Sequence, residues 1–201
     1  MTAQGSQLRF LVFVGSVRRN GMAARVGRFV QKLLETRHHS VEVLDPKELN
    51  LGEVIQPLHF YSNPRQVPAI LHHINEKIKA ADGFVVVAAE YNSAISPASS
   101  SLMGNFPQSS YAYRPSAIVT YSAGKFGGIR AAMQLRQFLS ELRTVHVPAM
   151  LVVPRVHETI LEDGEETTGG YLTRAGDTMC RQLAWYANAL KKHRESEDTP
   201  D

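Results

Sequence analysis

Residues 8–21 read LRFLVFVGSVRRNG, an apolar run that stops at a glycine and is followed by a short polar turn. An apolar run of this length, closed by a turn residue, is typical of a buried β-strand. Apolar residues then recur at helical spacing, at positions 26, 29, 30, 33 and 34. The stretch therefore predicts a strand, a turn and a helix, which is the opening unit of a parallel α/β sheet.

The rest of the chain repeats this alternation of strands and helices. We expect further strands at residues 41–43, 83–89, 116–121 and 147–153. Helices are expected from Pro64 to residue 78, around residues 131–142, and at 172–190. Residues 45–63 have no clear period and are expected to form a loop, and the stretch at 91–114 is expected to be rich in loops. Right-handed crossovers leave few topologies, and five strands suit the order 2-1-3-4-5 with helices on both faces, a flavodoxin-like three-layer sandwich.

Length and composition are those of an ordinary globular enzyme. The 201 residues suit one domain, which we expect at residues 1–193, followed by a charged and disordered tail at 194–201. The basic residues are scattered and the net charge is only +3, so the sequence predicts neither nucleic acid nor a membrane surface as a partner. Cys180 is the single cysteine, and the polar residues 1–7 lack the apolar core of a signal peptide, so a cytoplasmic location is expected.

Three turns follow the first, third and fourth predicted strands, where ligands of such sheets bind. In the first turn, backbone N–H groups at a helix start favour a phosphate, and the turn adds a hydroxyl and a charged donor. Its candidate residues are Ser16, Arg18, Asn20 and Gly21. The turn matches neither GxxxxGK[ST] nor GxGxxG, which disfavours a nucleoside triphosphate or a standard dinucleotide site. Taken alone, it also fits a plain strand-to-helix turn with solvated arginines.

The second and third turns could hold a flat heterocycle. The second offers an amide and an aromatic face, and its candidates are Ala89, Glu90, Tyr91 and Asn92. The third is rich in small residues that let the backbone approach a ligand closely, and its candidates are Ser122, Ala123, Gly124 and Gly127. The alternative for the second turn is a polar turn with Tyr91 packed at the surface. The alternative for the third turn is a flexible loop before a helix.

Three segments together resemble the NAD(P)H-dependent FMN reductase family, which includes FMN-binding quinone reductases and azoreductases. They are GSVRRNGMAARVGRFV from Gly15, EYN from Glu90 and YSAGKFGGIRAAMQLRQFL from Tyr121. The resemblance covers roughly residues 8–155 and implies FMN as the cofactor, with its phosphate at residues 16–21 and its ring at 89–92 and 122–124.

The same resemblance implies an enzyme that takes a hydride from NADPH or NADH and gives it to a small-molecule acceptor, which could be a flavin, a quinone or an azo compound. The flavin N5 would carry the chemistry, so no catalytic side chain and no metal is expected. A homodimer or homotetramer is also implied.

The chain departs from the family pattern beside the second turn. Ala89 stands where proline is usual, and Ser100, Ser101 and Gly104 stand where lysine, asparagine and aspartate are common. Two other functions therefore stay open: a flavodoxin-type FMN electron carrier, and a non-catalytic binding protein with a decayed flavin site.

Overall fold

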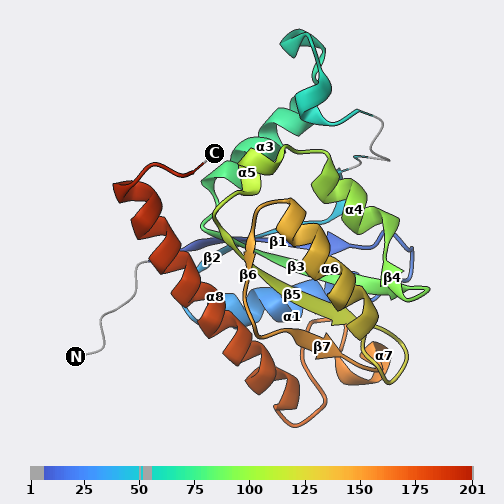
Figure 1. Cartoon of the computed structure of the whole chain (residues 1–201). Coiled ribbons are helices and arrows are strands. Elements are labelled where there is room, and N and C mark those ends of the chain that lie inside the picture. The colour runs from blue at the N-terminus through green and yellow to red at the C-terminus, as the bar shows by residue number, and fades with distance from the viewer. Residues whose placement is uncertain (1–6, 50, 52–55, 201) are drawn as a thin grey trace.

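A parallel sheet with helices on both faces forms the centre of the protein, in a computed structural model that describes residues 7–49, 51 and 56–200 (Figure 1). Within these residues the sheet has seven strands, with β2-β1-β3-β5-β6 as its path, β7 beside β5 and β4 beside β3. The strands are β1 (Arg9–Gly15), β2 (Ser40–Leu44), β3 (Gly83–Tyr91), β4 (Ala94–Ile95), β5 (Pro115–Tyr121), β6 (Val145–His146) and β7 (Leu151–Val153). Every pairing is parallel except that of β3 with β4.

Helices connect the strands. The α-helices are α1 (Ala23–Glu35), α2 (Pro46–Leu49), α3 (Ala69–Ala80), α4 (Pro97–Gly104), α5 (Gln108–Tyr111), α6 (Ile129–Glu141), α7 (Val156–Thr159) and α8 (Tyr171–Ser196). Two 3₁₀ turns, η1 (Leu58–Phe60) and η2 (Pro64–Gln66), precede α3. No helix in the described ranges is both long enough and apolar enough to cross a bilayer.

Alternate residues of the central strands point into two separate cores. Val12, Val85 and Val119 pack beneath α1 and α8, whereas Phe13 and Phe84 pack beneath α3, α4 and α6. Burial on both faces explains why β1, β3 and β5 are nearly continuous apolar runs. The half-exposed β2 lies at the edge, as its alternating sequence predicts.

The expected order of the five main strands is confirmed, but of the fifth strand, expected at 147–153, only β7 is present, and the short β6 precedes the expected range. Val147 N–H still donates to Ser116 O at 2.8 Å, whereas Pro148 has no N–H to donate. Ala149 N–H donates instead to the Gln182 side chain on α8, at 2.8 Å. The ladder is therefore interrupted at the proline and resumes at Leu151.

Two expectations about the connecting segments are wrong. The helix expected from Pro64 begins at Ala69, because Val67 precedes Pro68 and is held extended, with ψ 126°. The loop expected at 45–63 contains α2 and η1, while residues 50 and 52–55 lie outside the described residues. The stretch at 91–114, expected to be rich in loops, contains the short elements β4, α4 and α5, and Ser96 caps α4 by accepting from Ser99 N–H.

The closing helix α8 continues to Ser196, beyond the expected boundary at residue 193. Its last turns are held by polar contacts: Lys191 Nζ lies 3.1 Å from Asp82 Oδ1, and Arg194 donates to Tyr113 O at 2.5 Å. Residues 194–196 are therefore helical. Lys191 and Arg194 bind acceptors that lie just before β3 and β5, and these contacts hold the end of α8 against the sheet.

Candidate active site

The carboxyl ends of β1, β3 and β5 lie side by side. Gly15 is in register with Ala88, and Ala89 is in register with Tyr121. The three turns singled out in the sequence therefore leave the sheet at one edge, beside the switch point between β1 and β3, where the strand order reverses.

The first two turns are in direct contact. Ser16 is only 2% exposed, and its Oγ lies 2.9 Å from the Tyr91 hydroxyl, where either group could be the donor. The Arg18 guanidinium carbon lies 3.8 Å from the centre of the Tyr91 ring, a cation–π arrangement. Ser16 and Arg18 of the first turn therefore both contact Tyr91 of the second in the folded chain.

The first turn leads into a helix whose start carries no side-chain cap. Met22 is the cap residue of α1 and its side chain makes no capping hydrogen bond, so the cap residue leaves the first N–H groups of α1 without an acceptor. Gly21 N–H donates to Arg18 O at 3.0 Å, and a Cβ at Gly21 would lie 3.0 Å from the same oxygen. Asn20 is exposed beside this tight turn. The arrangement suits an anion at the helix start.

The second turn is a two-residue hairpin between β3 and β4. Asn92 and Ser93 both have positive φ, of 50° and 67°, a conformation that favours Asn and Gly and is costly for serine. Tyr91 pairs with Ala94 across it. Ala89 lies in the sheet, and its methyl group is buried in the core beneath α1 and α8. From Ala89 a ligand could therefore contact only backbone.

Glu90 contacts a helix rather than the space beyond the strands. Its Oε2 accepts from Arg130 N–H at 3.1 Å and from Ala131 N–H at 3.4 Å, and its Oε1 pairs with the Arg130 guanidinium at 3.3 Å. A carboxylate at this position satisfies the free N–H groups at the start of α6 and opposes the positive end of its dipole. Glu90 thus fixes α6, and the loop before it, against β3.

We expect Glu90→Ala to lower the free energy of unfolding by about 1–2 kcal/mol, because two N–H groups at the start of α6 lose their acceptor. Glu90→Gln keeps an acceptor and should lose roughly half as much. Thermal unfolding measures both, with Glu76→Ala as the control, since the exposed Glu76–Lys79 pair should contribute under about 0.5 kcal/mol. Wild-type stability in Glu90→Ala would contradict the capping role.

The two candidate glycines of the third turn, Gly124 and Gly127, have different surroundings. A Cβ at Gly124 would meet only Ser122 Oγ, at 3.9 Å, so open space lies beside this residue. A Cβ at Gly127, where φ is 60°, would lie 2.5 Å from Val152 Cγ1. Gly124 suits close approach of a ligand, whereas Gly127 is required by packing. Ser122 Oγ donates to Gly124 O at 3.1 Å, and Ala123 is exposed.

Tyr121, the residue at which the third resemblance segment begins, is a further candidate that was not among the predicted binding residues. It is 5% exposed, and its hydroxyl makes no hydrogen bond within the described part of the chain. Burial raises the pKa of the Tyr121 phenol well above its usual range, while the nearby Ser16 hydroxyl opposes the increase. A buried polar group without a partner is costly, and such groups gather where a ligand belongs. The position of Tyr121 directly before Ser122, at a strand end, was the available signal.

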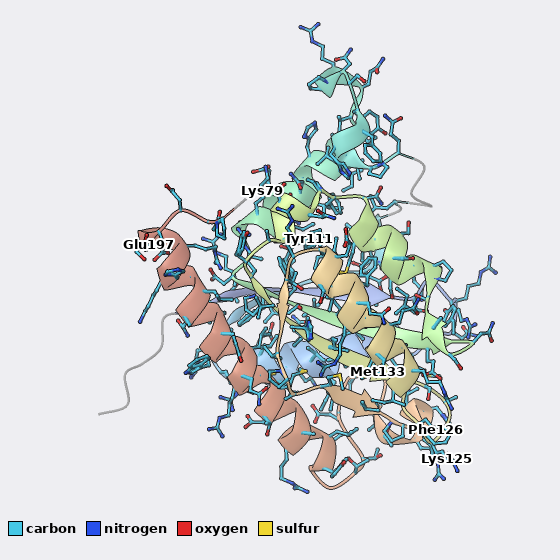
Figure 2. All side chains as sticks on the ribbon, viewed as in Figure 1. Lys79, Tyr111, Lys125, Phe126, Met133 and Glu197 are labelled. Atoms are coloured by element: carbon cyan, nitrogen blue, oxygen red, sulfur yellow. The ribbon has the colours of Figure 1, made fainter. Side chains whose placement is uncertain are left out.

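An exposed aromatic ring lies at the tip of the third turn. Phe126 is 52% exposed, and the Lys125 ammonium and Arg130 guanidinium lie 5.1 and 5.0 Å from its ring centre. Figure 2 shows Lys125 and Phe126 at the edge of the molecule beyond β5, far from Lys79 and Glu197. Among the described residues, no group of three or more His, Cys, Asp or Glu side chains could hold a metal.

Known proteins share this sequence pattern and this fold. The family model for NADPH-dependent FMN reductase matches residues 8–158. An NADPH azoreductase of Bacillus sp. (strain OY1-2) is 24% identical over 158 residues, covering 79% of this chain and 82% of its own. A quinone reductase of Escherichia coli (strain K12) is 27% identical over 191 residues, covering 87% and 97%.

Solved structures agree on the fold. FerB, a flavoenzyme NAD(P)H:(acceptor) oxidoreductase from Paracoccus denitrificans, superposes with a TM-score of 0.68 at 19% identity, covering 92% of this chain and 98% of its own. An oxidoreductase from Corynebacterium diphtheriae superposes with a TM-score of 0.64 at 17% identity, covering 90% and 97%.

Proposed function

Because the chain belongs to the NADPH-dependent FMN reductase family, we propose that it is an oxidoreductase that binds FMN across the carboxyl ends of β1, β3 and β5. When bound, FMN supplies hydride transfer from NADPH or NADH to a small-molecule acceptor, either a flavin, a quinone or an azo compound. The observation that supports the proposal most is the buried Tyr121 hydroxyl at the end of β5, which has no hydrogen-bond partner among the described residues.

The donors at this edge of the sheet fit such a cofactor. Ser16, Arg18 and the backbone N–H groups at the start of α1 would bind the phosphate. The backbone at residues 91–92 and 122–124 would orient the ring, and the open space beside Gly124 allows close approach. N–H donors from these two turns would stabilise negative charge at the ring edge, and no side-chain acid or base is required.

The serine-rich segment after Asn92 has a structural role in the free chain. Ser96 Oγ donates to Gly15 O at 2.5 Å, and Ser99 Oγ lies 3.4 Å from the same oxygen. These contacts fix α4 against the end of β1, directly before the first turn. Ser100 donates to Pro97 O within α4. The segment therefore holds α4 in place beside the first turn. This structural role weakens the argument for a non-catalytic protein with a decayed flavin site.

The visible absorption of the purified protein, before and after added FMN, tests the proposal. We expect a flavin spectrum that is bleached by NADPH or NADH without oxygen and restored by a quinone. Bound FMN that NADPH and NADH reduce only slowly would instead indicate an electron carrier. A colourless protein that takes up no FMN would overturn the proposal.

The assembly and the cellular location complete the proposal. We infer a homodimer or homotetramer in the cytoplasm, on the resemblance and on the sequence features given above. Light scattering of the purified protein measures the oligomeric state, and imaging of a fluorescent fusion measures the cellular location. A monomer, or a fusion outside the cytoplasm, would contradict the respective statement.

A further inference from the structure

Hydroxyl groups gather where β1, β3 and β5 end. Ser16 Oγ and the Tyr91 hydroxyl are 2.9 Å apart, and Tyr121 comes from the neighbouring strand, in register with Ala89. Ser16, Tyr91 and Arg18 are the residues of the two turns whose proximity alters the pKa of Tyr121. Within the described part of the chain, the buried Tyr121 hydroxyl nevertheless makes no hydrogen bond of ordinary geometry.

A serine hydroxyl has one proton and two acceptor lone pairs. We propose that Tyr121 is a positioning residue for Ser16: the two tyrosine hydroxyls, Tyr91 and Tyr121, donate to the Ser16 oxygen and so direct its only proton toward the phosphate of the cofactor. This inference rests on the proposed function, because it assigns a purpose to Tyr121 within the FMN site. The hydroxyl without a partner in the free chain gains one when the phosphate takes the Ser16 proton.

The same arrangement frees a second donor. Arg18 N–H lies 3.5 Å from Ser16 Oγ, a long contact that gives little stabilisation. When both lone pairs of Ser16 accept from tyrosines, the Arg18 N–H is left for the phosphate. Hydrogen bonds to a charged acceptor are about twice as strong as neutral ones, so the arrangement favours a phosphorylated ligand over its neutral analogue.

The affinity of the cofactor-free protein for FMN and for riboflavin, measured by flavin fluorescence quenching, tests the inference. We expect Tyr121→Phe to weaken FMN binding by about tenfold and riboflavin binding by less than about twofold, since riboflavin lacks the phosphate. The midpoint of thermal unfolding of the free protein should rise by about 2–4 °C, because a buried hydroxyl without a partner is removed.

Two further variants separate positioning from packing. Tyr111→Phe removes another buried phenol, which donates to Met103 O at 3.0 Å, and should lower stability without changing the ratio of FMN to riboflavin affinity. In a Ser16→Ala background, Tyr121→Phe should cause no further loss of FMN affinity, because the two residues act as one unit.

Equal losses for FMN and riboflavin, or effects of Ser16→Ala and Tyr121→Phe that simply add, would overturn the positioning role. Unchanged FMN affinity in Tyr121→Phe would do the same while leaving the proposed function intact. A wild-type protein that binds no FMN would overturn the function and the inference together.

Discussion

Replacing Arg18 with alanine is expected to weaken FMN binding by about 10- to 100-fold, because a charge-assisted hydrogen bond to a phosphate contributes about 1.5–3 kcal/mol. Arg18 is exposed in the first turn, directly beside the start of α1. Its contact with the Tyr91 ring joins that turn to the second, so loss of the side chain removes both a donor and a link between the turns. Fluorescence titration of FMN into the cofactor-free protein measures the change.

The neighbouring Arg19 supplies a matched control. Arg19 is also exposed, and carries the same charge one residue further along. Arg19→Ala should change FMN affinity by less than about threefold, and Arg18→Lys should give an intermediate loss because it keeps the charge but not the planar fork. Equal losses in Arg18→Ala and Arg19→Ala would indicate general electrostatic attraction rather than a contact with the phosphate.

The architecture could be predicted because its determinants are local. The strands at 83–89 and 116–121 are buried on both faces, so their apolar runs are visible without any knowledge of their neighbours. The interruption of the fifth strand could not be predicted from apolar character, because Val147 and Leu151 are both buried. Pro148 is the residue in the sequence that marks the interruption, because it has no N–H. The bond from Ala149 N–H to Gln182 instead of β5 is a property of tertiary structure.

The candidate site was predicted as three turns, and its internal contacts were not. Glu90 adjoins Tyr91 in sequence, yet its carboxylate binds the start of α6, 40 residues away. Nothing local to Glu90 carries that information. Tyr121 was assigned to the end of a strand, where an aromatic residue is common, and its place directly before Ser122 was the sequence signal. That its hydroxyl has no partner among the described residues is visible only in the structure. The sequence therefore does not reveal which polar atoms of the site already have hydrogen-bond partners.

Alanine at Gly127 and alanine at Gly124 are expected to affect different properties: the first should lower stability, and the second should weaken FMN binding. Gly127→Ala forces a Cβ to within 2.9 Å of Pro154 N and 2.5 Å of Val152 Cγ1, at a φ of 60°. Overpacking against backbone, added to left-handed strain, should lower the free energy of unfolding by about 3 kcal/mol and the unfolding midpoint by about 6–12 °C. Thermal unfolding of the cofactor-free protein measures this loss.

Gly124→Ala is the matched variant in the same turn. Gly124 lies outside the positive-φ region and has open space beside it, so the free protein should keep its stability to within about 0.5 kcal/mol. FMN affinity should nevertheless fall by at least about fivefold, because the added methyl group occupies space that we assign to the ring. Unchanged FMN affinity in Gly124→Ala, with the stability loss of Gly127→Ala intact, would move the ring away from the third turn. Loss of both properties in both variants would instead mean that the turn acts only through its own packing.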